Sequence, residues 1–160
     1  MQKKYRVAGY VKLAQKWEKR EKQAVEYNNA YYEEKFKNTQ FELVGVYIDI
    51  TGKKEICKRE HMMKLLKHCY RGEIDCIAAQ TRAFLAANHK EFCYLIFFLF
   101  SLPFHIDIIT EDEDYNIDTI HDYDDQSKEL YKWAYEYISL NEDDYLNWKK
   151  TIMDYVCDIK

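Results

Sequence analysis

The sequence predicts an α/β protein in which a parallel β-sheet is flanked by helices. Short segments rich in β-branched and aromatic residues alternate with longer segments that have helical periodicity. Such alternation is typical of strands joined by crossover helices, which makes the strands parallel. Glycine and proline are scarce, with four and one among 160 residues, so long irregular loops are not expected. Apolar residues make up 48% of the chain, enough to bury a core of single-domain size.

The predicted elements follow one another in a regular order. Four strands are expected at residues 5–13, 41–50, 74–79 and 105–110. Helices are expected at residues 15–37, 59–70, 88–102, 126–140 and 142–159, each with apolar side chains near helical spacing. We therefore expect an α/β domain over residues 1–125. Residues 126–160 are expected to form a helical C-terminal extension within the same compact unit.

Charge is distributed unevenly along the chain. Residues 1–71 contain 17 Lys and Arg against 9 Asp and Glu, whereas residues 72–160 contain 7 against 19. The basic half could face phosphate groups, which the acidic half would repel. The alternative is that the two halves present solvated helix faces of opposite sign. The overall charge of −4 hides this asymmetry.

Composition and spacing point to no cofactor, metal or membrane. Neither GxGxxG nor GxxxxGK[ST] can be written with these glycines, and the five histidines are isolated. The longest apolar stretch, residues 92–104, is interrupted and too short to span a bilayer. The five cysteines are scattered without a CxxC pair, which favours reduced thiols and a cytoplasmic location. Serine is also scarce, with none near the ends of the predicted strands.

Five short segments resemble the catalytic domains of the serine recombinases, the resolvase/invertase family, in their order and spacing. The segments are AGYV (8–11), AVEY (24–27), FELVGVYID (41–49), GEIDCI (72–77) and TRAFLAAN (81–88). The pattern is most similar to that of the large serine recombinases and covers about residues 5–120. The resemblance implies a resolvase-like parallel β-sheet flanked by helices.

Active members of this family are implied to cut DNA through a serine that attacks the phosphodiester and forms a 5′-phosphoserine link. In this sequence Ala14 stands at the position of that serine, so the nucleophilic oxygen is missing. Lys12 replaces an arginine two residues earlier, which keeps the charge but loses the bidentate guanidinium fork. Ala24 stands at the position of a polar active-site residue of the first helix.

In this sequence the charged groups of the family's second motif are also replaced. Phe84 and Ala87 stand at the positions of two arginines that would stabilise the charge developing on the phosphate, and Ala83 precedes the first of them. The resemblance therefore implies a degenerate site at which covalent chemistry has been abandoned.

Three functions follow from these observations. The first is a catalytically inactive recombinase-type domain that acts as an interaction or regulatory module in site-specific DNA recombination or on a mobile element. Its partner would be a second copy or an active recombinase, and the apolar stripe on residues 130–138 is the candidate contact unless it packs inward.

The second function is a protein that binds the DNA backbone without cutting it. Its candidate cations are Lys12, Lys16, Lys53, Lys54, Lys58 and Arg59. The third function is an active site-specific recombinase with an atypical site.

Overall fold

The computed structural model describes residues 4–112, 116–120 and 128–157. Its centre is a sheet of four parallel strands in the order β2-β1-β3-β4. The strands are β1 (Tyr5–Leu13), β2 (Phe41–Ile50), β3 (Cys76–Ala79) and β4 (Asp107–Thr110). The predicted α/β class is confirmed, and β3 and β4 each begin two residues later than expected.

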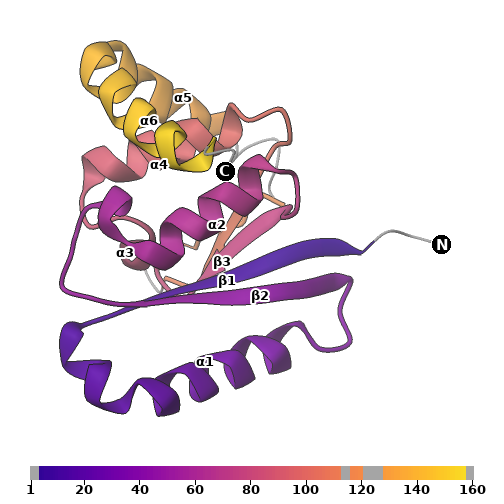
Figure 1. Ribbon diagram of the computed structural model, residues 1–160. Coiled ribbons are helices and arrows are strands. Elements are labelled where there is room, and N and C mark those ends of the chain that lie inside the picture. The colour runs from indigo at the N-terminus through magenta and orange to yellow at the C-terminus, as the bar shows by residue number, and fades with distance from the viewer. Residues whose placement is uncertain (1–3, 113–115, 121–127, 158–160) are drawn as a thin grey trace.

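Helices cover both faces of the sheet (Figure 1). They are α1 (Glu21–Phe36), α2 (Glu60–Tyr70), α3 (Arg82–Leu85), α4 (His89–Phe100), α5 (Lys128–Ser139) and α6 (Glu142–Val156). Among these described helices, α1 alone lies on one face, while α2, α3 and α4 lie on the other and α5 and α6 form an outer layer. None of the described helices is long and apolar enough to cross a membrane.

The alternation of side chains along β1 divides the core into two parts. Val7 and Val11 point to the α1 side and pack with Tyr32 and Phe36. Ala8 and Tyr10 point to the other side, where they join the larger cluster formed with α2, α4, α5 and α6. This alternation explains why a strand buried on both faces is apolar at almost every position.

The first predicted helix is divided in two. Residues Gln15–Arg20 form a 3-10 helix, η1, in which no residue is buried, and α1 begins only at Glu21. Arg20 has φ −130° and ψ 33°, outside the helical region, so a continuous helix from residue 15 is wrong. A second short 3-10 helix, η2 (Ile56–Lys58), and the four-residue α3 were not predicted, because single turns carry no periodic signal.

The C-terminal extension packs against the core. Leu130, Ala134 and Ile138 of α5 are buried, as are Tyr145, Ile152 and Val156 of α6. The stripe on residues 130–138 is therefore internal and is not available as a contact surface for a partner. The expected joint at residue 125, the start of the predicted helix at residue 126 and the end predicted at residue 159 lie outside the described residues.

The outer edge of β4 is occupied by residues 116–120. The backbone N–H of Thr110 donates to the carbonyl of Ile117 at 2.7 Å, and that of Thr119 donates to Ile108 at 3.1 Å. An isolated antiparallel bridge joins Ile109 to Asp118. This short return strand satisfies hydrogen-bonding groups that an open sheet edge would expose.

Candidate functional site

The carboxyl ends of the parallel strands, where ligands of such sheets usually bind, meet at one edge. Ala14 directly follows β1 at this edge and is exposed. Its backbone is extended, with φ −63° and ψ 153°, and its carbonyl accepts the first hydrogen bond of η1 from Trp17 at 3.0 Å. The end of β1 therefore presents a methyl group, which can neither attack a phosphate nor donate a proton.

A buried polar network lies beneath this position. The hydroxyl of Tyr10 donates to Oδ2 of Asp49 at 2.7 Å, across neighbouring strands β1 and β2. The carboxylate of Asp49 also accepts the backbone N–H groups of His61 at 2.9 Å and Met62 at 2.8 Å. Asp49 thus holds the N-terminus of α2, where a negative charge is stabilised. Burial and the neighbouring Asp49 carboxylate raise the pKa of Tyr10, so its hydroxyl stays protonated and serves as a donor.

Arg59 is buried rather than part of an exposed basic surface. Its Nη1 donates to the carbonyls of Phe84 at 2.7 Å and Leu85 at 3.3 Å, and its Nη2 donates to the carbonyl of Lys54 at 2.8 Å. The guanidinium therefore ties the loop after β2 to α3. From the sequence, Arg59 is expected to be one of the cations that face the DNA backbone, whereas the structure turns its side chain inward.

The predicted lysines lie nearer to solvent. Lys12 is half-buried, and its Nζ donates to the carbonyl of Thr51 at 3.3 Å. Burial lowers the pKa of Lys12, and the positive charge of Arg59 lowers it further. The negative charge of Asp49 acts in the opposite direction and only partly offsets these two effects. Four other candidate cations are exposed, namely Lys16, Lys53, Lys54 and Lys58.

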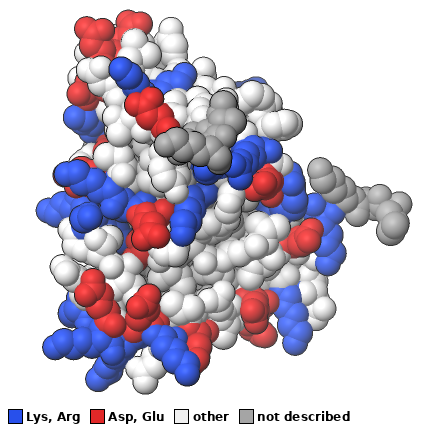
Figure 2. All heavy atoms as spheres, viewed as in Figure 1, with Lys and Arg blue, Asp and Glu red and all other residues white. Residues whose placement is uncertain are grey.

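These cations share their end of the molecule with carboxylates. A polar hollow of about 390 Å³ is lined by Lys53 and Lys58, but also by Glu18, Glu21, Asp49 and Glu60. Figure 2 shows the same mixture of basic and acidic side chains across the face in view. The surface at the ends of β1 and β2 is therefore patterned with both signs. A phosphate backbone would meet local repulsion as well as attraction there.

The second segment that resembles a family motif, residues 81–88, forms α3 and its flanks. The side chain of Thr81 caps α3 by accepting the N–H of Ala83 at 3.3 Å. Its hydroxyl donates to Asp112 at 2.6 Å, and Asp112 also accepts the backbone N–H of Arg82 at 3.1 Å. Burial alone would raise the pKa of Asp112, but these donors and the positive charge of Arg82 outweigh it and lower the pKa. The loops after β3 and β4 are thereby joined.

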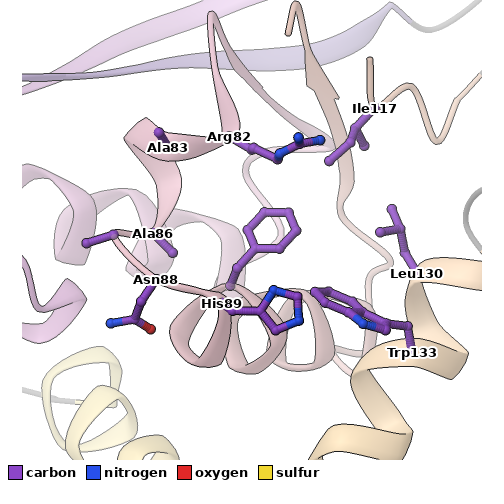
Figure 3. Close-up of a pocket in the computed structure, with 10 residues that line it drawn as sticks. Arg82, Ala83, Ala86, Asn88, His89, Ile117, Leu130 and Trp133 are labelled. Carbon is purple, nitrogen blue, oxygen red and sulfur yellow. The ribbon is translucent and has the colours of Figure 1, made fainter. Parts of the chain in front are cut away.

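The remaining positions at which the sequence predicts a lost catalytic group lie in different environments. Ala83 and Ala87 are exposed and line a second, mostly apolar hollow, which is shown in Figure 3. Phe84 is half-buried and packs against both parts of the core. Ala24 is buried in α1, where its carbonyl accepts the side-chain amide of Asn28 at 2.8 Å. Each of these positions is filled by an apolar side chain, and none supplies a charge to a phosphate.

Three buried cysteines and two described serines are placed unfavourably for nucleophilic attack. Burial raises the pKa of the Cys69 and Cys76 thiols well above the usual range and that of Cys93 to about 11, so these thiols are protonated near neutral pH. Ser101 follows α4, away from the carboxyl ends of the strands, and Ser139 bonds to its own helix. Among the described residues, no group of three or more His, Cys, Asp or Glu side chains could hold a metal ion.

No protein-family model and no curated protein matches the chain. The chain is similar to a solved structure, the N-terminal catalytic domain of TP901-1 integrase, with a TM-score of 0.59 and 15% sequence identity. The match covers 86% of this chain and 97% of that one. This chain has the serine recombinase catalytic-domain fold. The C-terminal catalytic domain of ISC1926 TnpA, an IS607-like serine recombinase, matches with a TM-score of 0.51 at 19% identity, over 66% of this chain and 70% of that one.

The serine recombinase fold confirms the resemblance seen in the sequence. Identities of 15% and 19% establish the fold alone, so the chemistry of the site has to be argued from the residues of this chain. In this chain Tyr10, Asp49 and Arg59 are buried near this edge, and the residue at the end of β1, Ala14, carries no hydroxyl. The hydrogen bond between Tyr10 and Asp49 and the inward position of Arg59 were not predicted, because both depend on contacts between segments that are distant in the sequence.

Proposed function

We propose that this chain is a serine recombinase-fold protein that does not cut DNA and acts as an interaction or regulatory module in site-specific DNA recombination. The observation that carries the proposal is Ala14, which is exposed at the end of β1 and lacks an oxygen. The likeness to two recombinase catalytic domains supports the recombination setting. Loss of the nucleophile would remove the covalent pathway altogether, whereas loss of one charge-stabilising donor costs about 3 kcal/mol.

The partner would be a second copy of the chain or an active recombinase. Because the stripe on residues 130–138 is internal, contact would use other apolar side chains on the outer layer. Those exposed there are Tyr131, Tyr135, Leu140, Leu146 and Tyr155, with Leu140 86% exposed. Size-exclusion chromatography with light scattering would detect self-association. Strand exchange by an active recombinase, measured with and without this protein, would test regulation, and an unchanged rate at saturating protein would contradict it.

Covalent trapping on supercoiled plasmid tests the absence of cutting. The natural protein is compared with an active serine recombinase and with a revertant carrying Lys12→Arg, Ala14→Ser, Phe84→Arg and Ala87→Arg. We expect no protein–DNA adduct from the natural protein under conditions in which the active enzyme is trapped. An adduct from the natural protein would overturn the proposal, and an adduct from the revertant would support the assignment of the degenerate positions.

Non-cleaving binding to the DNA backbone is the second candidate. The observation that favours it is the exposure of Lys16, Lys53, Lys54 and Lys58 near the ends of β1 and β2. If these lysines contact phosphates, the logarithm of the affinity should fall with the logarithm of salt by about 0.9 for each contact. Lys53→Gln with Lys58→Gln should reduce this slope by about two, whereas the exposed pair Lys64→Gln and Lys150→Gln should leave it unchanged. Absence of binding at low salt would remove this candidate.

A further inference from the structure

The edge of the sheet at β2 has no strand beside it. In the order β2-β1-β3-β4, β2 comes first, and within residues 4–112, 116–120 and 128–157 it pairs with β1 alone. Figure 1 shows β2 beside β1 with no labelled strand on its other side. The opposite edge, at β4, is occupied by residues 116–120. An unpaired strand of ten residues is a template to which another strand can add.

Alternate residues of β2 direct their backbone N–H and C=O groups away from β1. The N–H of Thr51 donates to the carbonyl of Leu13 at 3.0 Å, so every second residue counted back from Thr51 faces β1. Val46, Ile48 and Ile50 lie between these positions and face outward. Within the described part of the chain, no hydrogen bond reaches the outward backbone groups of these three residues. They are therefore free to bond to a further strand.

The side chains of β2 do little to prevent such an addition. Natural edge strands are often protected by lysine, by proline or by a bulge. The segment FELVGVYIDI contains no lysine and no proline, and its second carboxylate, Asp49, is buried by its bonds to Tyr10 and α2. A register shift at Val44 is the protection that β2 does have, and it leaves residues 45–50 regular. Val44 itself adds an apolar side chain that is 42% exposed.

Space beside this edge is open along its C-terminal half. The polar hollow of about 390 Å³ is lined by Ile48 and Ile50 of β2, and also by Glu21 of α1 and Glu60 of α2. Helices α1 and α2 lie on opposite faces of the sheet, and the described lining includes no residue of β1. The hollow therefore extends around the outer edge of β2, and neither helix covers the outward groups there.

The charges at the two ends of the edge favour a second copy of this chain as the occupant. A two-fold axis runs two β2 strands antiparallel, so each end of one strand meets the opposite end of the other. Pairing Val46 with Ile48 of the second copy uses the outward groups of both strands. This register brings the exposed carboxylate of Glu42 to the end of the other β2, where the exposed Lys53 follows. The mixture of signs at this end of the molecule is thus self-complementary.

We propose that two copies of this chain associate by antiparallel pairing of their β2 edges, which joins the two sheets into one continuous sheet. The apolar side chains exposed on the outer layer then stay free for a different partner. The proposal does not rest on the absence of DNA cutting, so covalent trapping and the test of self-association can fail separately.

The first test measures self-association of the full chain by sedimentation velocity and hydrogen exchange over a range of concentrations. We expect a concentration-dependent dimer in which the amides of Val46 and Ile48 exchange more slowly, while the amide of Tyr47, which faces β1, and the amides of α5 do not change. A chain that stays monomeric at about 1 mM would overturn the proposal. Protection in α5 without protection in β2 would overturn it as well.

The second test places a lysine at the edge. Val44→Lys should weaken the dimer by at least about tenfold, because an exposed lysine on an edge strand opposes pairing. Its matched control is Leu140→Lys, the same change at an exposed apolar residue of the outer layer, which should alter the dimer by less than about twofold. Circular dichroism and urea midpoints establish that both variants are folded. A larger effect of Leu140→Lys would place self-association on the outer layer and overturn the proposal.

The third test exchanges charges across the proposed two-fold axis. Glu42→Lys and Lys53→Glu should each weaken the dimer by about tenfold at low salt, because each places like charges opposite one another. The protein with both changes should recover the natural affinity to within about threefold. Failure of the combined variant to recover would overturn the antiparallel register.

Discussion

Three hydrogen-bond donors converge on the carboxylate of Asp49; two of these hydrogen bonds are buried and one is partly buried. They are the hydroxyl of Tyr10 and the backbone N–H groups of His61 and Met62. Removing the acceptor would leave three buried or half-buried donors without a partner. This is far more destabilising than replacing both the donors and the acceptor with apolar groups. The fold therefore depends on Asp49 as a hydrogen-bond acceptor, independently of any role in cutting DNA.

Asp49→Ala should lower the free energy of unfolding by about 3 kcal/mol, because a helix cap and a buried charge-assisted bond are both lost. Tyr10→Phe removes only one donor and should cost about 1 kcal/mol. Urea denaturation of the two variants checks the order of these effects. An Asp49→Ala protein as stable as the Tyr10→Phe protein would show that the amides of α2 gain nothing from the carboxylate.

The stability of the folded protein should be sensitive to acid because of Asp107. This residue begins β4 and lies at the end of the sheet opposite the carboxyl ends of the strands. Burial alone would raise the pKa of this carboxyl, but hydrogen bonds from His105, Tyr5 and Thr119 outweigh it and lower the pKa below the ordinary value of 3.8. A carboxyl with a lowered pKa in the folded state stabilises the protein above its ordinary pKa, and this stability is lost as the pH falls through the folded value.

Between neutral pH and about pH 4, the free energy of unfolding should retain the contribution of Asp107, and it should then fall as the pH is lowered further. Asp107→Asn should reduce this loss of stability at low pH, and it should lower the free energy of unfolding at neutral pH. Urea midpoints measured from pH 7 to pH 2 for both proteins provide the check. If the two proteins lose the same amount of stability as the pH falls, other carboxylates control that loss.

At the scale of elements, the contact between α1 and the sheet depends on one glycine. A Cβ placed on Gly9 of β1 would lie 2.8 Å from Cδ2 of the Tyr32 ring, closer than carbon atoms can approach. Tyr32 is buried and stacks on Phe36, so it has no free space into which to move. Gly45 of β2 provides the contrast, because its Cβ would meet Tyr47 at an ordinary 3.6 Å.

Gly9→Ala should therefore destabilise the protein by about 2 kcal/mol through overpacking, whereas Gly45→Ala should change stability by less than about 1 kcal/mol. Thermal and urea unfolding of both variants measure the difference. Because α1 is the one described helix on its face, Gly9→Ala should also increase hydrogen exchange in α1 more than in α2. Equal stability of the two variants would show that α1 can shift freely on the sheet.

The elements also show what the sequence could predict. Periodicity located the four strands and the long helices, because buried faces impose a spacing of two or of about 3.6 residues. It failed at η1, η2 and α3, where one or two turns are set by local hydrogen bonds and caps rather than by a buried stripe. The inward turn of Arg59 has no sequence signal, since its acceptors are the carbonyls of Lys54, Phe84 and Leu85.

The positions predicted to have lost catalytic groups follow only from the resemblance to serine recombinases, since absent groups leave no pattern of their own. The structure separates four of them into two places, while Ala24 is buried in α1 and Phe84 packs against the core. Lys12 and Ala14 belong to the edge of β1 and β2, whereas Ala83 and Ala87 line the apolar hollow. That hollow could not be predicted, because it is formed by α3, α4, α5 and the return strand, which are distant in sequence.

At the scale of the whole molecule, one buried carboxylate links the C-terminal extension to the α/β core. Glu91 of α4 accepts the indole N–H of Trp148 in α6 at 2.8 Å and the backbone N–H of Ile56 in η2 at 3.3 Å. Trp148 also packs against Tyr94 and Phe98 of α4. An element joined to the core by apolar packing and by a shared buried acceptor is expected to unfold with it.

We therefore predict that residues 126–160 and the α/β domain unfold as one cooperative unit. In a protein carrying Trp17→Phe and Trp133→Phe, the fluorescence of Trp148 reports on α6, and far-UV circular dichroism reports on all elements. The two urea midpoints should coincide, and Glu91→Gln should shift both by the same amount, equivalent to about 1.5 kcal/mol. A fluorescence transition at lower urea, or a Glu91→Gln effect confined to fluorescence, would show that the extension is a separate unit docked on the recombinase fold.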